Sequence, residues 1–172
     1  MSQGFTSFPY PANATFASIA FSPSTQGIVG TTTNNNAAAG YVGEFVSSVV
    51  LVGSAVSLTS GVTSAITSIS LTAGDWDCWC EFWTNAAGAT IISRVASTVY
   101  TTSAAFPGVP STDSSTSQAN YTSAVASLNF IFANGIARYS LASTTTIYLN
   151  ANVTFSASTC GGYGKLCARR VR

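Results

Sequence analysis

The chain has 172 residues and a mass of 17.6 kDa, which is enough for one domain with a buried core. Only 6% of its residues are charged, against about 25% in a typical globular protein, and the net charge is +1. The hydrophobic share of 47% excludes a disordered chain, the charge balance argues against nucleic-acid binding, and the absence of histidine removes Ser-His and Cys-His catalysis, so we expect no enzymatic activity and no cofactor.

Aromatic side chains and prolines are spaced irregularly in residues 1–33, where no strand or helix period is present. We predict an extended N-terminal arm that lies on a surface, with an irregular edge of the core as the alternative. The candidate anchors are Phe5, Phe8, Tyr10, Phe16 and Phe21. The start lacks the features of a secretory signal, and no stretch of about 18 uninterrupted apolar residues occurs, so we expect a cytosolic protein without a membrane partner.

Short β-rich segments separated by Gly, Ser, Asn and Pro clusters fill residues 34–172 and predict one all-β domain, an antiparallel sandwich or barrel. The expected strands are residues 41–52, 55–59, 67–72, 76–84, 90–101, 123–133, 136–142, 145–156 and 163–171. We expect the apolar stretch 37–58 to be buried. The polar stretch 107–120 predicts the longest loop, and Asn134-Gly135 predicts a type I′ hairpin turn.

Residues 76–83 alternate between two faces of one expected strand. The face placed inward carries Trp76, Cys78, Cys80 and Phe82. The other face carries Trp79 and Trp83 beside Asp77 and Glu81, and it is too apolar for open water, so we predict burial against another sheet or another subunit. A glycan-cleaving pair of carboxylates at Asp77 and Glu81 is the weaker interpretation of these acids, and solvation or pairing with an arginine is the better one.

The expected strand 145–156 alternates most regularly. The side chains predicted to point inward are Ile147, Leu149, Ala151, Val153 and Phe155. Between them Tyr148, Asn150 and Asn152 are expected to face outward, which predicts a strand buried on one face only.

Four cysteines allow three interpretations. Cys78 and Cys80 form C-x-C within a strand, whereas structural zinc sites usually need longer spacings, so metal binding is the weakest of the three. Free buried thiols and a disulfide remain open. The pair to test for a disulfide is Cys160 and Cys167, which enclose a glycine-rich segment expected to form a turn.

Four of the six cations lie within the last eight residues of the chain: Lys165, Arg169, Arg170 and Arg172. Aromatic residues do not alternate with them, so we expect no nucleic-acid contact. Pairing with Glu44, Asp75 or a neighbouring subunit is one interpretation, and a specific subunit contact through Arg169 and Arg170 is the sharper alternative.

Three segments carry a resemblance to a known group of proteins: residues 35–48 (NNAAAGYVGEFVSS), 63–77 (TSAITSISLTAGDWD) and 163–172 (YGKLCARRVR). They resemble small β domains of tailed-bacteriophage virion proteins, which occur as capsid decoration or head-fibre proteins and as tail-fibre tips. The resemblance extends from about residue 34 to the C-terminus, and GEFV and LTAGDWD are its most specific parts. It implies a jelly-roll-like antiparallel sandwich, usually a homotrimer, without enzymatic activity.

We therefore expect a virion protein that assembles in the cytoplasm of a bacterial host. The favoured role is capsid decoration or a head fibre, with the arm docked on the major capsid protein or another virion protein. The alternative is a tail-fibre tip that recognises a host-surface glycan or protein. A tip normally continues from a long shaft, whereas only about 33 residues precede the expected domain here.

Overall fold

The fold is described by a computed structural model for residues 33–108, 113–126 and 129–172. The chain divides into two units, Met1–Asn35 and Asn36–Arg172, and the β structure belongs to the second. The predicted anchors Phe5, Phe8, Tyr10, Phe16 and Phe21 lie outside the described residues.

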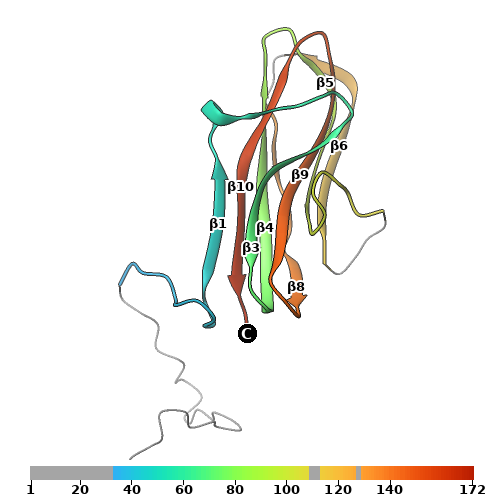
Figure 1. Cartoon of the computed structure of the whole chain (residues 1–172). Coiled ribbons are helices and arrows are strands. Elements are labelled where there is room, and N and C mark those ends of the chain that lie inside the picture. Colours follow the sequence, from blue (N-terminus) through green and yellow to red (C-terminus); the bar gives the residue numbers. More distant parts are fainter. Residues whose placement is uncertain (1–32, 109–112, 127–128) are drawn as a thin grey trace, which may run out of the picture. The chain divides into compact units, whose positions relative to one another are not determined.

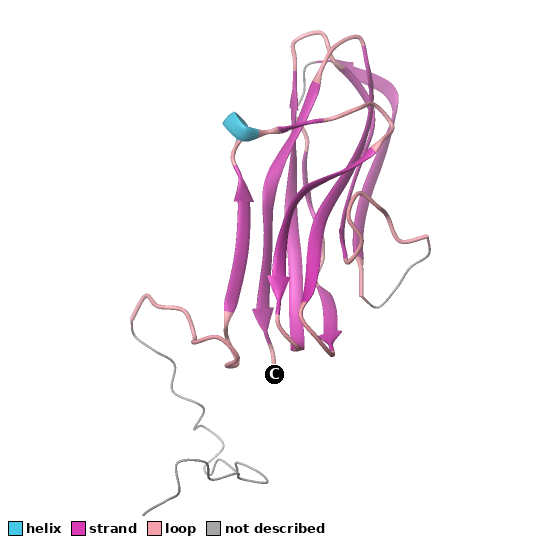
Figure 2. Cartoon of the chain, in the orientation of Figure 1, coloured by secondary structure: helices cyan, strands magenta, loops and turns pink. Residues whose placement is uncertain are grey.

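The described residues of the second unit form ten β-strands and one short 3₁₀ helix (Figures 1 and 2). The elements are β1 (Phe45–Val50), η1 (Val52–Ser54), β2 (Val56–Ser57), β3 (Thr63–Leu71), β4 (Gly74–Ala86), β5 (Ile91–Tyr100), β6 (Ser115–Ala126), β7 (Ile131–Ala133), β8 (Ala137–Leu141), β9 (Thr145–Ser156) and β10 (Cys160–Arg170). Within the described ranges, no helix has the length and apolar character that crossing a membrane requires.

The strands form two antiparallel sheets, which confirms the predicted β-sandwich. In sheet A, β10 lies between β1 and β4 (Figure 1). Strand β2 continues along the β1 side of β10, and β7 and β8 follow one another along the other side of β4. Sheet B has the order β3-β9-β5-β6. Consecutive strands therefore often lie in opposite sheets, and most pairings join distant parts of the sequence.

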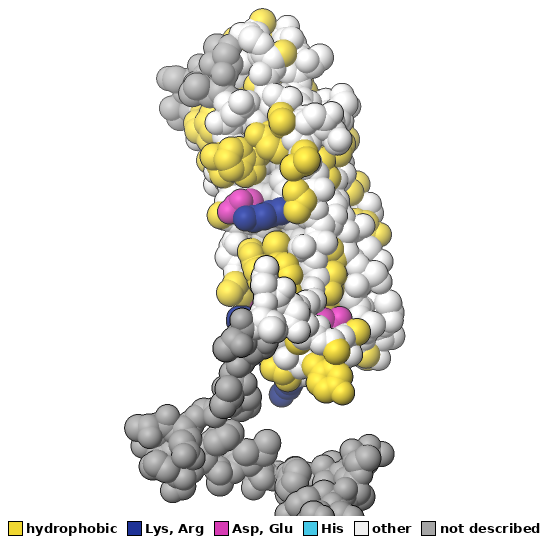
Figure 3. All heavy atoms as spheres, turned by 90° about the vertical axis from the view of Figure 1, so that its left-hand side faces the viewer, with side chains coloured by type: hydrophobic (Ala, Val, Ile, Leu, Met, Phe, Trp, Pro, Cys, Tyr) yellow, Lys and Arg dark blue, Asp and Glu magenta, His cyan; other side chains and the backbone are white. Residues whose placement is uncertain are grey.

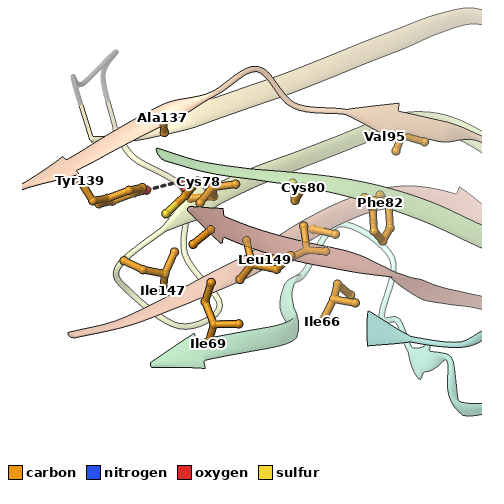
Figure 4. Packing of buried hydrophobic residues seen from close by; sticks show 14 of the residues in the cluster. Ile66, Ile69, Cys78, Cys80, Phe82, Val95, Ala137, Tyr139, Ile147 and Leu149 are labelled. Atoms are coloured by element: carbon orange, nitrogen blue, oxygen red, sulfur yellow. Dashed lines mark hydrogen bonds between the residues drawn. The ribbon is translucent and has the colours of Figure 1, made fainter. Parts of the chain in front are cut away.

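The core lies between the sheets, and the inward face predicted for β4 is confirmed. Its four side chains Trp76, Cys78, Cys80 and Phe82 are at most 1% exposed. They meet apolar side chains of the opposite sheet, among them Ile147 and Leu149 of β9 (Figure 4). The two thiols thus occupy the interior as small hydrophobic side chains.

Strand β10 begins at Cys160, so the expectation that the following glycines form a turn is wrong. Gly162 and Gly164 face the interior, where a Cβ at Gly162 would lie 2.8 Å from Ile66 and from Phe82. Gly164 has a φ of +149°, and a Cβ there would overlap the carbonyl oxygen of Glu81. These glycines let β10 pass close to β4 and to the large ring of Phe82.

The predicted loop 107–120 is wrong from residue 115 onward, because β6 begins there. The strand pairs with β5, and hydroxyl and amide contacts support it: Thr116 Oγ1 donates to Thr98 Oγ1 at 2.9 Å, and Arg94 donates to Gln118 Oε1 at 2.7 Å. A polar edge strand of this kind lacks the hydrophobic alternation that sequence patterns detect.

The predicted type I′ hairpin at Asn134-Gly135 is also wrong. Both β7 and β8 pair with β4 rather than with each other, and neither Asn134 nor Gly135 has a positive φ. The Asn134 side chain is instead buried and crosses to sheet B, where its amide donates to the carbonyls of Ser97 and Ser115 and its oxygen accepts from Ser97 Oγ. Asn134 therefore interrupts one edge strand and ties the two sheets together.

Strand β9 has the predicted bounds, but the middle of its outer face is buried rather than exposed. Asn150 is 0% exposed and Asn152 is 7% exposed. The Asn150 amide donates to the carbonyls of Thr102 and Ala105, while Asn152 donates to Gly61 O and accepts from Arg94. Loops of the same chain therefore cover this side of sheet B, and the asparagines supply the hydrogen bonds that those loops need.

Candidate interaction surface

The outer face of sheet A carries the predicted interface tryptophans. Because side chains alternate along β4, Trp79 and Trp83 point away from the core, and both are half-buried. Across the sheet, Trp79 is in register with Cys167, and Trp83 is in register with Tyr163. The predicted contact residue Arg169 is exposed at the end of β10 on this same face.

Two aromatic pairs organise this face. Phe45 of β1 lies near Trp79, with ring centroids 6.0 Å apart, and Trp83 lies near Tyr163, with centroids 5.8 Å apart. The rings of the two pairs are tilted by 46° and 37°. Such offset contacts fix the positions of the rings on the sheet and leave their outer surfaces available for further packing.

A groove of about 400 Å³ lies beside the second aromatic pair. One wall is residues 49–52, from the end of β1 into η1, and the other side is formed by Trp83, Tyr163 and an ion pair. The wall is strongly exposed, with Val49 at 58%, Leu51 at 70% and Val52 at 53%. On the side of the molecule that includes β1, hydrophobic side chains lie in groups around one adjoining acidic and basic pair (Figure 3).

The exposure of this wall corrects the expectation that the stretch 37–58 is buried. Its hydrophobic residues belong to an edge strand and to the turn after it, so only one side of the segment meets the core. Sequence reasoning consequently missed Val49, Leu51, Val52 and Tyr163 as surface residues. The two faces of β1 can be separated by its alternation: the exposed side chains are Phe45, Ser47 and Val49, and the half-buried ones are Val46, Ser48 and Val50.

The ion pair in the groove joins Lys165 Nζ to Glu81 Oε2 at 3.2 Å. The two side chains are 43% and 37% exposed, and such surface pairs stabilise a fold by about 0–1 kcal/mol. Because the charges cancel, the groove presents polar atoms without a net charge.

A second cluster corrects the prediction that Arg170 forms a subunit contact. Arg170 is 5% exposed, and its Nε donates to Glu44 Oε2 at 2.9 Å. Its other nitrogens donate to Ala73 O and to Thr72 Oγ1, and its guanidinium carbon lies 4.3 Å from the Trp76 ring centre. All of these partners belong to the same chain, which leaves Arg170 inside the domain and bears out the alternative of internal pairing with Glu44.

Asp75 holds two further cations at the same end of the sandwich. Arg138 approaches it at 2.6 Å and Arg172 at 2.8 Å. Hydrogen bonds from Arg138 outweigh burial and hold the pKa of the Asp75 carboxyl below its ordinary value. Burial raises the pKa of Glu44, but the hydrogen bonds from Gly40 and Arg170 and the charge of Arg170 together lower it. Both carboxylates are therefore ionised structural groups.

The structure bears out the interpretation of free buried thiols and excludes the possible disulfide between Cys160 and Cys167. Both thiols are free, as are Cys78 and Cys80. Cys160 and Cys167 lie seven residues apart on the continuous strand β10, about 23 Å at the usual strand rise, and on opposite faces. Burial raises the pKa of Cys78 and Cys80 to about 12 and that of Cys160 to about 11, so these thiols are protonated and unreactive near neutral pH.

The described residues contain no group of three or more His, Cys, Asp or Glu side chains placed to hold a metal ion. The groove on the outer face of sheet A instead presents aromatic and aliphatic side chains beside one neutral ion pair. Comparisons with protein-family models, with curated proteins and with solved structures found no match to this chain.

Proposed function

We propose that this chain is a structural protein of a tailed-bacteriophage particle, a capsid decoration or head-fibre protein that works by contact rather than catalysis. The observation that carries the proposal is the apolar outer face of sheet A. There Trp83 and Tyr163 lie beside the exposed Val49, Leu51 and Val52, and Trp79 lies near Phe45. A surface of this kind on a chain with so few charges is suited to permanent packing against other protein.

The segments that resemble phage virion domains support this proposal, because they converge in space. Glu44 comes from the first segment, Asp75 and Trp76 from the second and Arg170 from the third. Together they build the buried charged cluster at one end of the sandwich. The resemblance thus falls on residues that maintain the domain, as expected for similarity of fold.

We infer that the sandwich is jelly-roll-like. With β1 and β2 taken as one position and β7 and β8 as another, each sheet has four strand positions. Along the chain the strands then alternate as A, B, A, B, B, A, B, A, which places every sheet-A strand beside partners distant in sequence. Two nested Greek keys give this order, which supports the expected family architecture.

In this proposal the protein is a homotrimer in the virion, and the aromatic residues of the N-terminal arm attach it to the capsid. Burial of two or three aromatic rings at about 25 cal/mol per Å² gives several kcal/mol for each arm, and three arms act together.

The copy number of the protein in purified particles tests the role. A decoration protein is expected in high copy, comparable with the capsid subunits, in gel densitometry of the particles. A handful of copies contradicts capsid decoration and indicates a fibre tip.

Replacement of Phe5, Phe8 and Phe16 by Ser in the full chain tests the arm, since the variant should keep its β-type circular dichroism spectrum and lose attachment to particles. Full attachment of that variant shows that the arm is not the anchor.

A further inference from the structure

We propose that the groove on sheet A is an interface between copies of this chain, in which Leu51 and Val52 of one copy pack against Trp83 and Tyr163 of the next. This inference rests on the proposed function, because it names the partner of the same apolar face. The sequence predicts a subunit contact at Trp79, Trp83, Arg169 and Arg170. The interface proposed here is centred instead at the end of β1, and it does not include Arg170.

The two sheets differ in what covers their outer faces. On sheet B, loops of the same chain bury Asn150 and Asn152 completely or nearly so. On sheet A, Val49, Leu51 and Val52 remain more than half exposed in the described part of the molecule. Aliphatic side chains clustered beside two aromatic rings are costly to leave in water, and a protein surface that covers them removes that cost.

The charge of the groove favours a second copy as its occupant. Lys165 and Glu81 neutralise each other, so the groove attracts neither a strongly acidic nor a strongly basic partner. A copy of this chain, with 6% charged residues and a net charge of +1, offers the matching uncharged surface. On association the ion pair becomes shielded from water and fixes the register of the two copies.

The edge of sheet A offers a second element of contact. The Asn36 side chain binds both the N–H and the carbonyl of Phe45, so these backbone groups point away from β10. By the alternation of an antiparallel pair, the backbone groups of Ser47 and Val49 point the same way. A neighbouring copy that packs its apolar residues into the groove therefore also meets a strand edge with hydrogen-bonding capacity.

The geometry is compatible with a closed ring. The exposed ridge at Leu51 and Val52 directly adjoins the groove that it would fill in a neighbour. In a ring, each copy can place its ridge in the groove of one neighbour and receive the ridge of the other neighbour in its own groove. Such a heterologous contact gives a closed ring when the rotation between neighbouring copies divides a full turn into a whole number of steps.

The test is sedimentation of the full chain and of two charge variants, Leu51→Glu and Val62→Glu. Both positions are exposed and apolar, at 70% and 52%, but only Leu51 lines the groove. We expect an oligomer for the wild type, an unchanged oligomer for Val62→Glu, and a dissociation constant at least about 30-fold higher for Leu51→Glu. The thermal unfolding of dilute Leu51→Glu should match that of the dilute wild type, which separates lost assembly from lost folding.

A wild-type monomer at micromolar concentration, or an equal oligomer in both variants, overturns the inference. A third variant, Phe16→Ser with Phe21→Ser, tests whether the arm of the same chain covers the groove. The inference is also overturned if this variant red-shifts the tryptophan emission at every concentration while Leu51→Glu leaves the sedimenting mass unchanged. Attachment to particles is scored separately. A wild-type monomer that still decorates particles in high copy contradicts this interface and the proposed homotrimer, but it leaves the proposed role in capsid decoration standing. If the wild type is an oligomer and Leu51→Glu is a monomer, the interface is supported whether or not the variant attaches to particles.

Discussion

Arg170 shows how one side chain can join several segments. Its guanidinium contacts the loop before β1 through Glu44, the β3–β4 turn through Thr72 and Ala73, and the core through Trp76. Gly74 belongs to this arrangement, because a Cβ there would overlap the guanidinium. The sequence indicated pairing with Glu44 as one possibility, but it could not separate Arg170 from Arg169, since adjacent strand residues have opposite surroundings that composition does not reveal.

Replacement of Arg170 by Ala is expected to lower the free energy of unfolding by about 3–5 kcal/mol, because the Glu44 carboxylate is left buried without its partner. Arg169→Ala is the matched control on the exposed neighbour and should change it by no more than about 0.5 kcal/mol. Urea denaturation of the two variants measures the difference. Equal small effects would show that the buried ion pair is not needed for stability.

Acid should weaken the domain through Glu44 and Asp75. Their folded-state pKa values lie below the ordinary values of 4.5 and 3.8, so the stability that they contribute is complete above about pH 5. It is lost as the pH falls through those ordinary values towards the lower folded-state values, because the unfolded chain binds protons first. Unfolding followed between pH 6 and pH 2 should show a smaller pH dependence for Glu44→Gln with Asp75→Asn than for the wild type. An unchanged slope contradicts the assignment.

At the scale of elements, sequence patterns predicted the strands whose faces differ strongly in hydrophobicity. The bounds of β9 and the inward face of β4 follow from regular alternation. The first part of β6 was missed because its serine and threonine side chains support the sheet through hydrogen bonds, which leave no hydrophobic period. The outer asparagines of β9 were misplaced because loops distant in sequence cover them, and a strand pattern contains no information about those loops.

Asn134 is expected to matter through its side chain rather than through a turn. Asn134→Ala removes hydrogen bonds to Ser97 and Ser115 and leaves the buried Ser97 hydroxyl without its acceptor, so the free energy of unfolding should fall by about 2 kcal/mol or more. Chemical denaturation measures this change. A near-neutral substitution would mean that the sheets are held together without this bridge.

Gly164 should be the least replaceable glycine of β10. An alanine there combines a φ of +149° with overlap against Glu81 O, and we expect a loss of at least about 2 kcal/mol. Gly135→Ala is the control, because its φ is ordinary and its nearest neighbour would be 3.7 Å away. That control should stay within about 1 kcal/mol of the wild type in thermal or urea unfolding. If Gly135→Ala is the more damaging change, the type I′ turn has to be reconsidered.

For the whole molecule, composition and turn spacing were sufficient to predict an all-β sandwich, because every segment is too short and too rich in β-formers for a helical bundle. The candidate surface was predicted only in part. Trp79 and Trp83 stood out because large rings alternate with core residues along one strand, whereas the wall at Val49 and Leu51 depends on β1 being at the edge of sheet A. Edge position is a property of topology, which a local pattern cannot supply.

The four cysteines should behave as interior residues of the whole domain. Iodoacetamide is expected to modify none of them in the native protein at pH 7.5 and all four after unfolding in urea, because burial both blocks access and raises the pKa of each thiol. Intact-mass spectrometry counts the adducts. A native mass lower than the fully reduced mass by two hydrogens would reveal a disulfide and contradict the free thiols.

The position of β10 has a consequence for synthesis in the cell. It follows the other nine described strands along the chain, yet it lies in the interior of sheet A, with β1 on one side and β4 on the other. Phe45 can meet Arg169 only after nearly the whole domain has been synthesised, so sheet A stays open between β1 and β4 until β10 is made. Until then β1 lacks the strand that it pairs with, and β4 is paired on only one edge, by β7 and β8. Any product that stops before Cys160 keeps these open edges permanently, as a substrate for chaperones and proteases.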